Sequence, residues 1–264
     1  MLEFCKITII TRDSTKVPFF IGSNIRGAFG RELKNIVCID EVKDCKACKF
    51  TQDCLYYQFY EHKNTYHHFR FDFELGKNYY DFSIVLFNES IESAIIIMAV
   101  LRKILIDEFF CKAFSVFVNN RLCDINDIAT LPLKQPFIAR EFAPCVRLTL
   151  NTPLRIKKHN SFVRDDRLEL KDIFYSIFQR KLAISGENRT KMPDFSGKIT
   201  YKNLRYMELY RKSRNHNEMR LGGLVGEIYI EDLDRESFAL LNLGELIGVG
   251  KQCSFGLGKI SIVY

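Results

Sequence analysis

The spacing of hydrophobic and polar residues predicts the same order of elements in each half of the chain. Alternating apolar residues predict strands, and apolar residues three and four positions apart predict helices. In the N-terminal half the order is strand, helix, strand, strand, helix, strand, over residues 3–11, 23–37, 68–74, 79–87, 91–106 and 113–118. In the C-terminal half the order repeats, with a basic segment after the first helix, over 146–151, 168–184, 224–230, 236–247 and 259–263.

This repetition predicts an α+β fold made of two tandem ferredoxin-like (RRM-like) domains, each in the order βαββαβ. Pro132, Pro136 and Pro144 fall in a stretch with little helical or strand periodicity, which is typical of a linker. We therefore expect an N-terminal domain with a cysteine-rich, metal-binding insertion, a linker, and a C-terminal RNA-binding domain with a glycine-rich loop. Their ranges are 1–130 with the insertion at 38–66, then 131–145, then 146–264.

The composition is that of a folded, soluble protein. Of the 264 residues, 47% are hydrophobic and 27% are charged, which is close to the average for globular chains. The longest unbroken apolar run, Ala94–Leu101, is well short of the roughly 20 residues that a membrane helix needs. Because the opening sequence MLEFCKITII has no basic leader or cleavage site, we expect a cytoplasmic protein that does not bind a membrane.

The net charge of +7 belongs to the C-terminal half. Residues 1–130 hold 16 basic and 17 acidic residues, whereas 131–264 hold 23 and 15. The segment 198–220 interleaves seven basic residues with three tyrosines. Such a mixture is typical of a surface that neutralises phosphates and stacks on bases, and a solvated helix face is the other interpretation.

Four of the nine cysteines form a motif. Cys38, Cys45, Cys48 and Cys54 have the spacing C-x6-C-x2-C-x5-C. Four thiolates suit a structural Zn²⁺ ion, and an iron–sulfur cluster uses the same ligands. A full set of four protein ligands leaves no open position, so the metal would brace the insertion and take no part in catalysis. Thiols without metal in a loop are the alternative.

A glycine cluster near the C-terminus reads LGELIGVGKQCSFGLGKI. Glycines permit positive φ, and amides freed in such turns can line a concavity for anionic oxygens, helped here by Lys251 and Lys259. Ordinary hairpins are the other interpretation of the same glycines.

Several segments resemble a known family. LTLNTPLRI at 148–156, MRLGGLVGEI at 219–228 and LLNLGELIGVGKQCSFGLGKI at 240–260 resemble the C-terminal domain of the CRISPR-associated endoribonuclease that processes precursor crRNA, a member of the RAMP superfamily. IRGAFGRELKNIVC at 25–38, the next three cysteines and LYYQFYE resemble the first helix and cysteine-rich insertion of one branch.

The resemblance implies a CRISPR repeat-specific endoribonuclease that needs no catalytic metal. In that reaction the 2′-hydroxyl attacks the adjacent phosphate and leaves 2′,3′-cyclic phosphate and 5′-hydroxyl ends. The implied partners are CRISPR repeat RNA, its crRNA product and other CRISPR effector subunits. The sequence agrees with the absence of a catalytic metal, because it has no compact carboxylate cluster of the kind that a two-metal nuclease uses.

Members of this family commonly carry a catalytic histidine on or soon after the first helix, but 23–37 contains none. The candidates are therefore His67 and His68, then His216, with Tyr66 as a helper, because imidazole can serve as acid or base near neutral pH. The candidate RNA-binding residues are cations on the first helix, cations in the basic segment, and the glycine loop. They are Arg26, Arg31, Lys34, Arg211, Lys212, Arg214, Arg220, Gly248, Gly250, Lys251, Gly256 and Gly258.

Two other functions remain open at this point. One is a catalytically inactive subunit that holds crRNA in an effector complex, which the missing helix histidine would explain. The other is a metal-containing α+β domain that binds protein.

Overall fold

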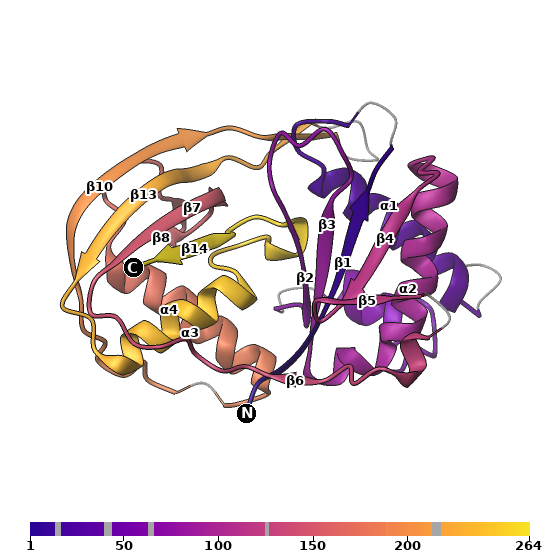
Figure 1. The fold of residues 1–264 in the computed structure, drawn as a ribbon, viewed down its shortest axis with the longest axis horizontal. Helices are drawn as coiled ribbons and strands as arrows, with labels where there is room; N and C mark the ends of the chain where they lie inside the picture. The colour runs from indigo at the N-terminus through magenta and orange to yellow at the C-terminus, as the bar shows by residue number, and fades with distance from the viewer. Residues whose placement is uncertain (14–16, 40–43, 63–65, 125–126, 189, 213–217) are drawn as a thin grey trace. The chain divides into compact units, whose positions relative to one another are not determined.

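In the computed structural model, the chain divides into two compact units, Met1–Pro136 and Phe137–Tyr264. The structure describes all residues except 14–16, 40–43, 63–65, 125–126, 189 and 213–217. Figure 1 labels the helices and strands of both units.

The strand β1 (Glu3–Thr11) is the centre of the N-terminal sheet. Its odd-numbered residues from Cys5 to Thr11 are buried and the even-numbered ones are not, as the apolar alternation predicts. The antiparallel order is β2-β3-β1-β4-β5, and β6 pairs with the beginning of β1. The other strands are β2 (Phe69–Phe73), β3 (Phe82–Phe87), β4 (Phe114–Val118), β5 (Arg121–Cys123) and β6 (Gln135–Pro136).

Two helices, α1 (Gly22–Val37) and α2 (Ala94–Lys103), contact each other and lie against one face of this sheet (Figure 1). Phe29 of α1 packs on Phe69 and Phe71 of β2. A 3-10 helix at Asn88–Ser93 precedes α2 and a π-helical turn at Ile104–Glu108 follows it, so the predicted helix 91–106 has three parts. A further 3-10 turn lies at Ile128–Thr130. No helix among the described residues is both long and apolar enough to cross a membrane.

The cysteine-rich insertion follows α1 and ends in a π-helical turn at Tyr57–Glu61. Phe59 of this turn stacks on Phe69 with ring centroids 4.4 Å apart. The hydroxyl of Tyr60 donates to the carbonyl oxygen of Arg26 at 2.7 Å. The end of the insertion is therefore anchored on α1 and β2.

The C-terminal sheet is antiparallel in the order β10-β13-β7-β14. Its strands are β7 (Val146–Leu154), β10 (Lys198–Met207), β13 (Gly223–Glu231) and β14 (Ile260–Val263). The helices α3 (Leu170–Ser185) and α4 (Arg235–Ile247) contact each other and lie under one face of this curved sheet (Figure 1). Asp234 begins α4 by accepting a hydrogen bond from the Ser237 amide at 2.7 Å.

Two small hairpins and a short turn extend the C-terminal unit. The first hairpin joins β8 (Lys157–Lys158) to β9 (Ser161–Phe162), and the second joins β11 (Tyr210–Lys212) to β12 (Glu218–Arg220). A 3-10 turn at Cys253–Phe255 lies within the glycine-rich ending.

Both units therefore have the βαββαβ order and the strand order of a ferredoxin-like domain, which confirms the predicted fold class. The strand that the hydrophobic pattern left unassigned in the C-terminal half is β10, in the first part of the basic segment. Within the expected linker, Gln135–Pro136 pairs with β1, and Arg140 donates to Asn242 Oδ1 and forms an ion pair with Glu245.

Candidate nucleic-acid interface

The glycine-rich ending is a closed loop that requires glycine. Positive φ angles occur at all four of its predicted RNA-binding glycines, Gly248, Gly250, Gly256 and Gly258. A Cβ on Gly258 would lie 1.7 Å from the carbonyl oxygen of Val249. A Cβ on Gly250 would lie 2.6 Å from the carbonyl oxygen of Arg155. Both the conformation and the space at these two positions exclude a side chain.

Thr152 of β7 connects this loop to the sheet. Its hydroxyl donates to the carbonyl oxygen of Gly256 and accepts from the amide of Lys259, both at 2.9 Å. The Thr152 side chain is fully buried. The backbone carbonyl oxygen of the nearby Arg155 accepts from the amide of Lys251 at 2.9 Å. The segment LTLNTPLRI and the glycine-rich ending are therefore one assembly, although about a hundred residues separate them.

The amides of the four glycines all have acceptors within the unit. They donate to the carbonyl oxygens of Gly244, Cys253 and Pro153 and to the hydroxyl of Ser176, at 2.7–3.1 Å. The prediction that freed amides of this loop line a concavity for anionic oxygens is thus corrected, because these four amides close the loop itself. Lys251 is exposed and Lys259 is half-buried.

Arg155 lies at the centre of a group of cations and aromatic rings. Its guanidinium carbon lies 4.2 Å from the centroid of the Phe162 ring, and Lys157 lies 5.1 Å from the same centroid. Arg164 lies 5.4 Å from the ring centroid of Tyr206. Such rings hold cations by cation–π attraction and offer faces for stacking.

The Arg155 side chain is buried, and burial lowers the pKa of its guanidinium. One terminal nitrogen donates to the carbonyl oxygen of Gly222, while Nε has no acceptor among the described residues. A buried guanidinium with an unused donor is suited to an oxygen of a bound ligand. Sequence reasoning missed Arg155, although it is the basic residue at the end of LTLNTPLRI.

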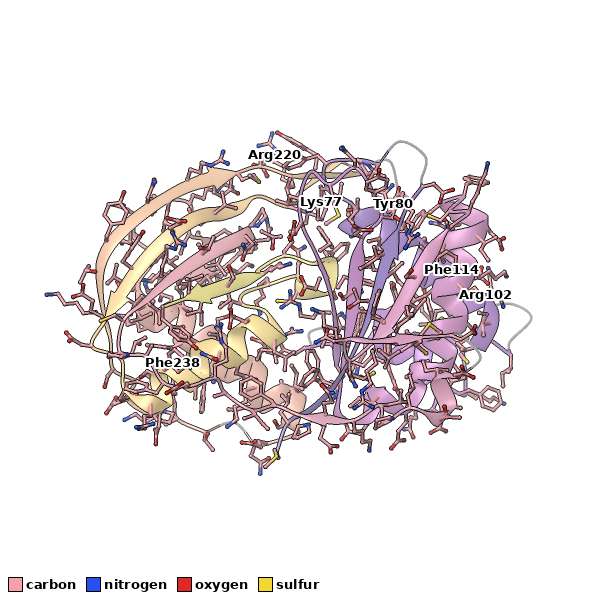
Figure 2. All side chains as sticks on the ribbon, in the orientation of Figure 1. Lys77, Tyr80, Arg102, Phe114, Arg220 and Phe238 are labelled. Carbon is pink, nitrogen blue, oxygen red and sulfur yellow. The ribbon has the colours of Figure 1, made fainter. Side chains whose placement is uncertain are left out.

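One cation of the basic segment lies beside the glycine-rich ending. Arg211 of β11 lies 4.8 Å from the ring centroid of Phe255, in the glycine-rich ending. Arg220 is exposed on β12 (Figure 2). Lys202 is instead used within the unit, because its ammonium donates to the carbonyl oxygen of Leu168 at 3.2 Å. Lys212 lies on β11 beside Arg211, and the predicted Arg214 and His216 lie outside the described residues.

The three predicted cations on α1 have partners within the N-terminal unit. Arg26 is buried with its guanidinium 4.3 Å from the Tyr60 ring centroid. Arg31 forms an ion pair with Glu108, and Lys34 lies 5.0 Å from the Tyr56 ring centroid. The structure therefore gives Arg26 a packing role, whereas Arg31 remains exposed and Lys34 half-buried.

Three of the predicted catalytic side chains precede β2. Tyr66, His67 and His68 are half-buried. The His67 ring lies 5.6 Å from the Phe69 ring, whereas Nδ1 of His68 lies 3.3 Å from Oε2 of Glu89. A carboxylate on one ring nitrogen fixes the orientation of an imidazole and leaves the other nitrogen for proton transfer. The His68 ring therefore has a carboxylate neighbour, in a contact whose side chains are 36% and 81% exposed.

The four predicted metal ligands lie around one small cavity. Cys38, Cys45, Cys48 and Cys54 line it together with Tyr56 and Tyr57. Burial raises the pKa of the Cys45 thiol, and a hydrogen bond with Lys34 offsets part of that rise. No cysteine of the part that the structure describes is in a disulfide.

Comparison with known families identifies the C-terminal unit. Residues 148–260 match the family model of the CRISPR-associated endoribonuclease Cas6. The C-terminal unit is a Cas6-family domain. The matched range contains Thr152, Arg155, the basic segment and the glycine-rich ending, and for this unit it confirms the family to which the sequence resemblance pointed. Residues 2–109 match a second model, AF_1859_N, which is described as an N-terminal domain.

Solved structures show that the whole chain has the two-domain Cas6 fold. A Cas6 (TTHB231) product complex is 14% identical, with a TM-score of 0.55 and 100% of both chains covered. A RAMP protein binding different RNA substrates is 12% identical, with a TM-score of 0.51 over 99% of this chain and 100% of that one. A partial Cas6-RT-Cas1–Cas2 complex is 11% identical, with a TM-score of 0.58 over 99% of this chain. This chain spans 46% of the length of that protein. No curated protein sequence matches.

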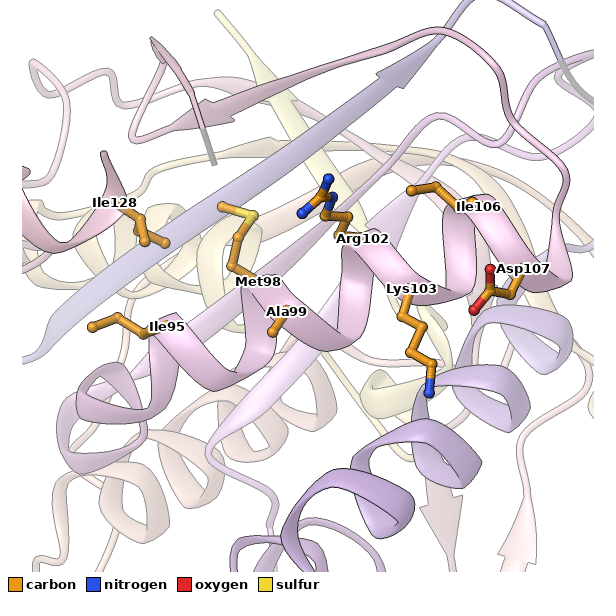
Figure 3. Close-up of a pocket in the computed structure, with 8 residues that line it drawn as sticks. All are labelled: Ile95, Met98, Ala99, Arg102, Lys103, Ile106, Asp107 and Ile128. Carbon is orange, nitrogen blue, oxygen red and sulfur yellow. The ribbon is translucent and has the colours of Figure 1, made fainter. Parts of the chain in front are cut away.

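Outside the Cas6-family domain, a groove of about 490 Å³ runs along α2 (Figure 3). Apolar side chains, among them Ile95, Met98 and Ile106, line it together with Arg102, Lys103 and Asp107. Lys103 pairs with Glu32 of α1. None of the described candidates Tyr66, His67 and His68 is among the residues that line this groove.

Proposed function

We propose that this chain is a CRISPR repeat-specific endoribonuclease that cleaves precursor crRNA once in each repeat. The observation that carries the proposal is the Cas6-family match over 148–260, because segments of this range meet at Arg155 in the structure. The similarity to a Cas6 product complex and to an RNA-binding RAMP protein supports an RNA substrate. Association with other CRISPR proteins, as in the Cas6-RT-Cas1–Cas2 complex, is part of the same proposal.

The proposed reaction is a transesterification that needs no metal ion. The 2′-oxygen attacks the adjacent phosphorus, and the bond from phosphorus to the 5′-oxygen breaks. A base takes the proton of the 2′-hydroxyl, an acid protonates the leaving 5′-oxygen, and cations stabilise the charge that develops on the phosphoryl oxygens. The products are a 2′,3′-cyclic phosphate and a 5′-hydroxyl.

Arg155 is the residue that we assign first to RNA binding. Its planar guanidinium can donate two parallel hydrogen bonds to a phosphate or a base, and its Nε donor has no acceptor among the described residues. Arg211, Arg220 and Lys251 add exposed or half-buried positive charge within the same unit. Phe162 and Tyr206 supply rings on which bases can stack.

His68 is the residue that we assign first to proton transfer. Glu89 on its Nδ1 favours the tautomer in which Nδ1 carries the proton, so Nε2 can accept a proton from a 2′-hydroxyl and donate it later. His67 and His216 remain the other candidates, with Tyr66 as a hydrogen-bond donor to the developing charge.

The test is cleavage of labelled repeat RNA by the purified chain in excess EDTA. We expect one discrete cut that EDTA does not prevent and that a single 2′-deoxy substitution at the cut abolishes. His68→Ala should lower the cleavage rate by about two to four orders of magnitude, the usual contribution of a general acid or base. Cleavage that stops in EDTA while the protein remains folded, or binding without cleavage, would contradict the proposal.

The matched control is His159→Asn. His159 is an exposed histidine with φ +48° in the turn between β8 and β9, and asparagine tolerates that conformation. This variant should cleave as the parent chain does. If His67→Ala or His216→Ala is inactive while His68→Ala is not, the acid–base role moves to that residue.

A further inference from the structure

The cysteine-bearing part of the insertion, from Cys38 to Cys54, forms no hydrophobic core of its own in its described residues. None of its described residues from 44 to 54 is buried, and Phe50 is 55% exposed. The first buried side chain after Cys54 is Phe59, in the π-helical turn at the end of the insertion. A segment that buries so little apolar surface cannot offset the entropy of ordering its backbone by packing alone. It needs a cross-link.

The cysteines of this segment differ from the cysteines of the core. Cys5 and Cys111 are buried among apolar residues, and burial raises their pKa values to about 12 and about 11. They behave as small hydrophobic side chains. Cys38, Cys45, Cys48 and Cys54 are half-buried instead, and all four line one shared cavity.

Two details of this cavity fit a metal ion bound by thiolates. The amide of Phe50 donates to Sγ of Cys48 at 3.4 Å, which is the kind of outer-shell hydrogen bond that orients a metal ligand. The cavity holds about 20 Å³, enough for about one water-sized sphere. That volume suits a single ion better than a cluster of several iron and sulfide ions.

We propose that Cys38, Cys45, Cys48 and Cys54 bind one Zn²⁺ ion in tetrahedral geometry and that this ion holds the insertion on α1. Among the described residues, no three side chains are already arranged as a metal site. The ion would therefore draw the sulfurs together, as in small domains whose local folding is coupled to metal binding.

The positions of the four cysteines indicate which part of the fold the ion would hold in place. Cys38 ends α1, with its amide bonded to the carbonyl oxygen of Lys34, and the carbonyl oxygen of Cys54 accepts from Gln58 at the start of the π-helical turn. A cross-link between them fixes the turn that carries Tyr60. The Tyr60 ring fills the space above Gly30 and lies under the Arg26 guanidinium.

The test is the metal content of the purified full chain. We expect about one zinc ion per chain, by the four-ligand stoichiometry of structural sites. Cys48→Ser should lower the zinc content about tenfold or more, whereas Cys145→Ser, which removes the exposed cysteine outside the motif, should leave it unchanged. Equal zinc content in the two variants, or iron with sulfide in place of zinc, would overturn the proposal.

Two further measurements use the parent chain, so their results do not depend on whether a variant folds. An organomercurial titrated into the parent chain should release the zinc as the thiolates are consumed. Reconstitution with Co²⁺ should give the intense absorption of sulfur-to-metal charge transfer and of tetrahedral cobalt. Failure of the chain to bind Zn²⁺ or Co²⁺ under reducing conditions would overturn the proposal. Because metal content is measured without RNA, the result is independent of the cleavage assay.

Discussion

The glycine-rich ending of the C-terminal unit and the cysteine-rich insertion of the N-terminal unit both depart from a βαββαβ framework. Residues 253–258 are all buried, and the amides of Phe255, Gly256 and Gly258 and the hydroxyl of Thr152 are paired within the unit. Residues 44–54 contain no buried side chain. The glycine loop thus takes its shape from close backbone packing. The described residues of the insertion have no packed interior, and four cysteines line a small cavity there instead.

This difference predicts which substitutions each segment tolerates. A loop held by backbone contacts should fail when one atom is added to it, because no neighbour can move away. A segment held by side chains on its surface should tolerate added atoms and should fail only when the cross-link or the anchoring ring is removed.

The largest effect is expected from Gly258→Ala. The added Cβ would lie 1.7 Å from a carbonyl oxygen, at a position with φ +68°. Strain and overpacking together should lower the free energy of unfolding by about 3 kcal/mol or more. Thermal or urea unfolding of the purified chain measures this loss.

Gly186→Ala is the matched control for that change. Gly186 ends α3 with φ +66°, but no atom lies within 4 Å of its added Cβ. Only the backbone penalty of about 1 kcal/mol should appear. Equal losses in the two variants would mean that conformation alone, and not close packing, requires the glycine at 258.

Only part of the fold and of the candidate site could be predicted from the sequence. The βαββαβ order was predictable because apolar residues recur with the period of each element, as in β1. The strand β10 was not, because it is an edge strand whose charged and tyrosine side chains hide the alternation. The role of the glycine amides was not predictable either, since two of their acceptors, Ser176 of α3 and Pro153 of β7, come from distant segments. Arg155 was missed because the spacing of apolar residues gives no information about the role of a single arginine.

An intermediate effect is expected from Thr152→Val, which keeps the shape of the side chain and removes its hydroxyl. The carbonyl oxygen of Gly256 and the amide of Lys259 would lose their partner in a buried site. The cost of leaving such groups unpaired is about 2 kcal/mol. Thr149→Val, on the same strand but half-exposed, should change stability by less than about 0.5 kcal/mol in the same urea titration. A similar loss in both would show that the hydroxyl of Thr152 does not hold the loop.

The smallest effect, and the one that examines the insertion directly, is expected from two glycines of α1. Alanine at Gly27 has room, since the nearest atom would be 3.6 Å away, and should stabilise the helix by about 1 kcal/mol. The Cβ of an alanine at position 30 would lie 2.5 Å from the Tyr60 ring, so the ring would have to move. The cost of displacing the ring offsets the gain in helix propensity. Gly30→Ala should therefore give no net stabilisation, and limited proteolysis should cut residues 44–54 faster in it than in Gly27→Ala. If both variants gain stability and resist protease equally, Tyr60 does not anchor the insertion on α1.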